Sequence, residues 1–153
     1  LYAGIENNSK VVIAAINGYA FGGGFEIALA CDMIVAAAGT KMGLPEILLN
    51  LIPGGGGSLR LTKKIGINLT NEIVMTGRTI VAEEMHARGV INYIYPRENF
   101  IEKATEFAQT FAAQLPDRLQ AIKQLTQEAA NGITAALQAK EAAALGIQFS
   151  SPI

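Results

Sequence analysis

Residues 11–38 read "VVIAAINGYAFGGGFEIALACDMIVAAA", and this stretch decides the fold. In residues 10–16 an apolar run rich in β-branched side chains follows Lys10 and is closed by an Asn-Gly pair, which predicts a strand buried on both faces. Three glycines, Gly22 to Gly24, then precede "FEIALACD", which predicts a helix, and "MIVAAA" predicts a second buried strand. A strand, a helix and a strand within about thirty residues indicate an α/β protein.

The rest of the chain continues this pattern and then becomes helical. Residues 41–66 predict a short extended piece, a helix start at Pro45, a second glycine cluster at Gly54 to Gly57 and an amphipathic helix. Two further helices end at Gly77 and Gly89, and "VINYIY" predicts a strand. Because only helices are predicted after Arg97, we expect a core at residues 1–98 and a helical region at residues 99–153.

Composition and charge exclude several classes of function. The formal net charge is −1 and Lys and Arg form no cluster, which argues against a nucleic-acid surface. The longest apolar runs are short or broken by charge, so we expect no membrane span and no membrane partner. The single cysteine, Cys31, excludes an internal disulfide and a multi-Cys metal site. The chain begins at Leu1 rather than Met, so we expect it to be part of a longer protein.

The glycine clusters fit none of the standard nucleotide or hydrolase motifs. A Walker loop needs Lys and Ser or Thr after Gly24, where Phe25 and Glu26 stand. The dinucleotide fingerprint fails in both clusters, and a nucleophile elbow around Ser58 fails because Arg60 replaces its second glycine. Two interpretations remain for the first cluster. It is either an oxyanion hole, in which bare N–H groups at a helix start contact a substrate oxygen, or a tight turn between a closely packed strand and helix.

Two glutamates share an unusual setting. Glu26 lies among apolar residues just after the first glycine cluster. Glu46 directly follows Pro45, and after it along the chain come apolar residues and then the second glycine cluster. An ionised carboxylate buried without a partner costs several kcal/mol, so each group should be bonded or functional. As a pair in a site of low polarity, one could act as general base and the other as general acid. The alternative is that each merely complements a helix dipole.

At these residues the sequence resembles a known family. The segments "VVIAAINGYAFGGGFEIALACD", "MGLPEILLNLIPGGGG" and "MTGRTIVAEEMHARGVINYIYP" closely resemble the crotonase superfamily, and within it the enoyl-CoA hydratases. The resemblance covers nearly all of the chain. It implies an α/β fold of the crotonase (ClpP/crotonase) type, a spiral of β-β-α turns followed by a helical region.

The resemblance also implies a site and a reaction. Gly23, with Gly22 beside it, is expected to supply a backbone N–H that binds the thioester carbonyl. Glu26 and Glu46 match the two catalytic glutamates, and Gly54 is expected beside the nucleophilic water. These groups would add water to a 2-enoyl-CoA by way of an enolate and give a 3-hydroxyacyl-CoA. No metal and no redox cofactor is implied, since coenzyme A is part of the substrate.

The family's further properties are carried over as expectations. They are an acyl-CoA substrate, assembly into a homotrimer or hexamer through residues 99–153, and a location in the cytoplasm, or in mitochondria of a eukaryote. Family members carry a portion before Leu1 with the second oxyanion N–H, and a last helix beyond Ile153, so we expect this chain to be inactive without the rest of its parent. The alternatives are an enoyl-CoA isomerase, another acyl-CoA lyase of the fold, and a non-catalytic scaffold.

Other residues carry smaller expectations. His86 is expected on the surface, and Cys31 is expected to be a small buried side chain. The Asp32 side chain is expected to form a hydrogen bond with the backbone. Asn50 stands where the family usually has glycine, and asparagine tolerates a left-handed backbone. Tyr19 and Phe21 are expected in the acyl pocket or in the core, and Arg60, Lys63 and Lys64 near phosphates or on a solvated face.

Overall fold

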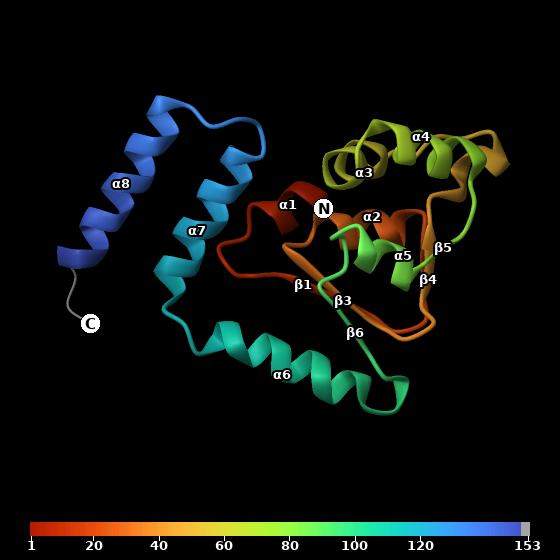
Figure 1. The fold of residues 1–153 in the computed structure, drawn as a ribbon, viewed down its shortest axis with the longest axis horizontal. Helices are drawn as coiled ribbons and strands as arrows, with labels where there is room; N and C mark the ends of the chain where they lie inside the picture. The colour runs from red at the N-terminus through yellow and green to blue at the C-terminus, as the bar shows by residue number, and fades with distance from the viewer. Residues whose placement is uncertain (151–153) are drawn as a thin grey trace. The chain divides into compact units, whose positions relative to one another are not determined.

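The computed structural model describes residues 1–150, and the chain folds into two compact units. The first unit holds Leu1–Asn8 and Val12–Ala108, and the second holds Ser9–Val11 with the chain from Gln109 onward. Figure 1 shows their elements in chain order. The assignment of residues 99–153 to assembly stays a prediction.

Two three-stranded sheets form the framework of the first unit. The first sheet has the order β1-β3-β6, with all pairs parallel, and consists of β1 (Ile13–Ile16), β3 (Met33–Ala37) and β6 (Tyr93–Tyr95). The second has the order β2-β4-β5 and consists of β2 (Tyr19–Phe21), β4 (Lys41–Gly43) and β5 (Ile80–Val81). In this sheet β2 and β4 are parallel, whereas β5 is antiparallel to β4.

The chain passes from one sheet to the other and then into helices, twice in succession. The first turn is β1, β2 and α2 (Gly23–Ala30), and the second is β3, β4 and the helices η1 (Pro45–Leu49), α3 (Gly57–Ile65) and α4 (Ile67–Thr76). The shorter α5 (Ala82–Ala87) joins β5 to β6, and η2 (Arg97–Asn99) follows β6. At the start of the chain α1 (Tyr2–Glu6) packs against α2.

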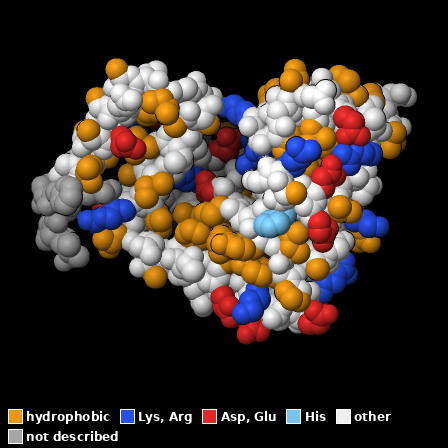
Figure 2. Space-filling model, in the orientation of Figure 1, with side chains coloured by type: hydrophobic (Ala, Val, Ile, Leu, Met, Phe, Trp, Pro, Cys, Tyr) orange, Lys and Arg blue, Asp and Glu red, His pale blue; other side chains and the backbone are white. Residues whose placement is uncertain are grey.

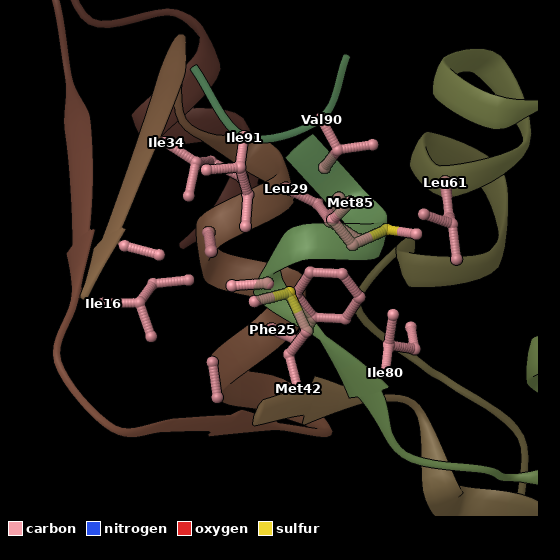
Figure 3. Close-up of a cluster of buried hydrophobic side chains, with 14 of the residues drawn as sticks. Ile16, Phe25, Leu29, Ile34, Met42, Leu61, Ile80, Met85, Val90 and Ile91 are labelled. Atoms are coloured by element: carbon pink, nitrogen blue, oxygen red, sulfur yellow. The ribbon is translucent and has the colours of Figure 1, made fainter. Parts of the chain in front are cut away.

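The main core lies around α2. Phe25 and Leu29 of this helix, Met42 of β4 and Met85 of α5 are buried in one cluster, shown in Figure 3. Because α2 is buried on most of its surface, any polar side chain that it carries inward is removed from water.

The second unit is helical. It contains the end of α6 (Phe100–Ala112), then α7 (Pro116–Ala129), with Pro116 at its first position, and α8 (Ala135–Ser150), which packs against α7. Lys123 of α7 is buried and donates a hydrogen bond to the Lys10 carbonyl at 2.9 Å. No helix of the described residues is both long and apolar enough to cross a membrane.

The structure confirms the predicted elements and adds three that the sequence did not reveal. The strands and helices expected around the two glycine clusters are present, and Asn50 has the left-handed backbone expected of it, with φ of 57°. The additional elements are α1, β2 and β5. Segments of two to five residues are too short for a hydrophobic period to reveal them.

Candidate active site

The pairing of β2 with β4 brings the two glutamates into one region. These parallel strands place Phe21 opposite Gly43, so their carboxyl ends lie side by side. The Gly22 N–H donates to the Gly43 carbonyl at 3.0 Å and joins the turn before α2 to the end of β4. Glu26 and Glu46 are in the first turns of the helices that follow these two strand ends, which explains why they meet.

The backbone at Gly22 sets the turn between β2 and α2. Its φ of 57° and ψ of −126° form a combination that is open essentially to glycine alone. A Cβ at this position would lie 3.8 Å from Glu46 Oε2. The Glu46 carboxyl therefore faces the turn that begins α2.

The second glycine cluster encloses the Glu26 side chain, which is only 2% exposed. A Cβ at position 57 would lie 2.8 Å from Glu26 Cγ, and a Cβ at position 55 would overlap Glu26 Oε2. Sequence reasoning selected Gly54, where a Cβ would meet nothing within 4 Å, and missed Gly55 and Gly57. Four glycines in a row gave no signal to separate them.

Burial and a second carboxyl both act on the protonation of Glu26. Loss of water raises the pKa of Glu26, and the neighbouring Glu46 carboxyl raises it further. The Gly55 N–H and the Tyr2 hydroxyl lower the pKa and partly offset this rise. Glu26 Oε2 and Glu46 Oε1 are buried without a hydrogen bond in the described part of the chain. Burial and the neighbouring Glu46 carboxyl therefore favour the protonated form of Glu26.

This raised pKa predicts a pH dependence of stability. Between the ordinary value of 4.5 and the higher folded-state pKa, the folded protein binds more protons than the unfolded chain. The Glu26 contribution is therefore full below pH 4.5 and is lost as the pH rises through the folded-state pKa. We expect Glu26→Gln to gain stability relative to the wild type as the pH rises above 4.5, measured by denaturant unfolding at several pH values. A difference that stays constant across that range would contradict the raised pKa.

A backbone donor stands next to the carboxyl pair. Gly23 is the first residue of α2 and is exposed, and its N–H has no acceptor among the described residues, whereas the Gly22 N–H is already used. Free N–H groups at a helix start stabilise negative charge on a nearby oxygen. The structure thus brings Glu26 and Glu46 together, and Gly23 directly follows the Gly22 turn that the Glu46 carboxyl faces. The roles expected for these residues and for Gly54 stay predictions.

Three of the smaller expectations are confirmed. His86 is exposed and is the pale blue side chain in Figure 2. Cys31 is buried, and Asp32 Oδ2 accepts a hydrogen bond from the Val12 N–H at 2.8 Å. On the face shown in Figure 2, acidic and basic side chains are interspersed rather than gathered by sign.

For two groups of residues the structure excludes one of the two expected alternatives. The other alternative, the acyl pocket for Tyr19 and Phe21 and a position near phosphates for Arg60, stays a prediction. Tyr19 and Phe21 are not core residues, because Tyr19 is 75% exposed and the two rings stack on each other with centroids 6.3 Å apart. Arg60 is not on a simple solvated face, because it forms an ion pair with Glu6 and donates to the Gly55 carbonyl at 2.7 Å. Strand β2 is too short to show which face its aromatic residues occupy, and the partner of Arg60 is distant in sequence.

Comparison with known proteins gives consistent matches. The family profile described as "Enoyl-CoA hydratase/isomerase" matches residues 1–151. A 2,3-dehydroadipyl-CoA hydratase of Escherichia coli (strain K12) is 38% identical over 84% of this chain and 50% of its own length. A carnitinyl-CoA dehydratase of Salmonella heidelberg (strain SL476) is 47% identical over 76% of this chain and 44% of its own length. The chain thus spans about half the length of the curated relatives it matches.

A solved structure extends the agreement to the fold. The crystal structure of an enoyl-CoA hydratase from Bacillus anthracis matches with a TM-score of 0.92 and 34% identity. The match covers 98% of this chain and 58% of that one. This agreement confirms the expected crotonase-type α/β fold, with its β-β-α turns and its helical C-terminal region.

Proposed function

Because this chain belongs to the enoyl-CoA hydratase/isomerase family of the crotonase superfamily, we propose that its full-length protein is an enoyl-CoA hydratase. The observation that carries the proposal is the meeting of Glu26 and Glu46 at the start of α2, where the Gly23 N–H has no acceptor among residues 1–150. Hydration needs a base for water, an acid for the α-carbon and a donor for the carbonyl oxygen. These three groups can supply all of them.

In the proposed reaction water adds across the double bond of a 2-enoyl-CoA. The Glu26–Glu46 pair takes a proton from water while the water oxygen bonds to Cβ. The π electrons of the carbon–carbon double bond then move toward the thioester carbonyl, so that its oxygen becomes negative. The Gly23 N–H stabilises this enolate, and one such donor is typically worth about 3 kcal/mol in the transition state. The pair then delivers a proton to Cα and restores the carbonyl. Coenzyme A serves as part of the substrate, and no further cofactor takes part.

Two alternatives fit the site less well. By the family resemblance, an isomerase generally lacks the first glutamate, which is present here as Glu26. A scaffold without activity would have no need to keep two neighbouring carboxyls that each bury an oxygen without a hydrogen bond among the described residues. The name of the carnitinyl-CoA dehydratase relative refers to loss of water, which is the same chemistry in reverse and could use the same acid–base pair.

The test is hydration of crotonyl-CoA by the full-length protein. We expect absorbance of the conjugated thioester to fall as 3-hydroxybutyryl-CoA forms, with the product identified by mass spectrometry. No hydration of this or longer 2-enoyl-CoA substrates, together with isomerisation of a 3-enoyl-CoA, would replace the hydratase proposal with an isomerase. The same assay on residues 1–153 tests the expectation that this part alone is inactive.

We also propose that the helical region mediates assembly into a trimer or hexamer. Several apolar side chains of this region are exposed: Ile101 of α6, Ile122 of α7 and Leu145 of α8, together with Leu115 and Ile133 just outside α7. Contact with another copy would bury them. Sedimentation velocity of the full-length protein measures its oligomeric state, and a monomer at micromolar concentration would contradict this assignment.

A further inference from the structure

Tyr2 reaches the candidate active site from a part of the chain that no motif marked. A Cβ at Gly55 would overlap both Glu26 Oε2 and the Tyr2 hydroxyl, so these two oxygens lie against the same glycine. A Cβ on Gly23 would lie 3.8 Å from the Tyr2 hydroxyl oxygen. The hydroxyl is therefore located between the start of α2 and the second glycine cluster, next to the buried carboxyl.

Arg60 of α3 holds α1 in this place. Its guanidinium lies 5.7 Å from the centroid of the Tyr2 ring, a cation–π contact. The same side chain forms an ion pair with Glu6, at the other end of α1, and donates to the Gly55 carbonyl at 2.7 Å. One arginine thus connects the Tyr2 ring, the end of its helix and the glycine that the Tyr2 hydroxyl contacts.

One oxygen of the buried Glu26 carboxyl is left without a hydrogen bond beside the Tyr2 hydroxyl. Glu26 Oε2 is buried and makes no hydrogen bond among the described residues, and buried carboxyl oxygens are almost always paired. The groups that surround it are Glu46 of η1, Tyr2 of α1 and the Gly55 N–H, with Arg60 of α3 and its partner Glu6 behind Tyr2. Among these side chains, the Tyr2 hydroxyl is the donor that lowers the pKa of Glu26. Its O–H can rotate about the C–O bond to reach an acceptor.

We propose that Tyr2 is a positioning residue whose hydroxyl donates a hydrogen bond to the Glu26 carboxyl and keeps this carboxyl directed toward Glu46. The contact itself does not depend on the reaction, whereas its consequence for catalysis rests on the proposed function. A donor to a carboxylate favours the ionised form, so Tyr2 opposes the effects of burial and of Glu46. It thereby favours the ionised form of Glu26, which is the form that can accept a proton.

The test is an NMR titration of the Glu26 carboxyl in the full-length protein labelled with ¹³C-glutamate. The Glu26 resonance is assigned by its loss in Glu26→Gln. Tyr2→Phe removes the hydroxyl but keeps the ring and its contact with Arg60. The matched control is Tyr93→Phe, because the Tyr93 ring stacks on Tyr95 of the same strand, β6, with centroids 5.8 Å apart.

We expect the Glu26 midpoint to move to higher pH in Tyr2→Phe and to stay unchanged in Tyr93→Phe. A wild-type midpoint in Tyr2→Phe, or an equal shift in the control, would overturn the proposal. A second variant, with 3-fluorotyrosine at position 2, guards against a folding defect because it keeps the hydroxyl and makes it a stronger donor. It should move the midpoint to lower pH, and an unchanged midpoint in this variant would also count against Tyr2.

An activity measurement separates this proposal from the proposed function. If the full-length protein hydrates crotonyl-CoA, Tyr2→Phe should shift the pH profile of kcat in the direction of the NMR midpoint and change KM little. A purely structural role would lower kcat equally at all pH values. If no hydration is found, the proposed function fails, and the titration alone still decides whether Tyr2 positions Glu26.

Discussion

Replacing Glu46 by glutamine in the full-length protein is expected to lower kcat for crotonyl-CoA hydration by about 10²- to 10⁴-fold. Glutamine has nearly the same shape but cannot exchange a proton near neutral pH, so the carboxyl pair loses one of its two proton carriers. Substrate contacts are kept, and KM should therefore change much less than kcat. Steady-state kinetics on the purified variant measures both constants.

Two further variants test whether the loss of kcat in Glu46→Gln is specific to the carboxyl pair. Glu102→Gln makes the same chemical change on the exposed surface of α6 and should retain wild-type kcat. The double variant Glu26→Gln with Glu46→Gln should lose about as much activity as either single variant, since residues that act as a unit are not additive. Wild-type kcat in Glu46→Gln would remove the proposed role of the pair.

Replacing Gly55 by alanine is expected to damage both stability and the site. The new Cβ would overlap Glu26 Oε2 and Tyr2, and the Glu26 side chain is buried and already lies close to Gly57. Overpacking of this kind costs about 1 to 3 kcal/mol of unfolding free energy. Displacement of the carboxyl by about 1 Å could cost a further 10²-fold in kcat of the full-length protein. Denaturant unfolding and steady-state kinetics measure the two effects.

The adjacent glycine provides the matched control for stability. Gly54→Ala adds the same methyl group one residue earlier, where nothing lies within 4 Å, and neither glycine has a positive φ. Its free energy of unfolding should therefore stay within about 0.5 kcal/mol of the wild type. Equal effects of the two substitutions would show that Gly55 does not enclose the Glu26 carboxyl as described.

Much of the local structure followed from the sequence, because it depends on neighbours along the chain. The apolar run before Asn17 and the glycines before Phe25 predicted a strand and a helix that the structure confirms as β1 and α2. The left-handed Asn50 was also predictable, since asparagine tolerates that backbone. The two glutamates could be selected as a pair because a carboxylate among apolar residues is costly to bury unless it is bonded or has a function.

What only the tertiary structure decided is which groups meet. The pairing of β2 with β4 places the turn at Gly22 beside the start of η1, and no local pattern encodes the register of two strands whose partners are 22 residues apart. The same holds for Gly55 and Tyr2, which contact Glu26 across 29 and 24 positions of sequence. Each residue by itself determines its side-chain type and its local backbone preference. The environment that sets the pKa of a buried carboxyl is created only when distant segments pack around it and exclude water.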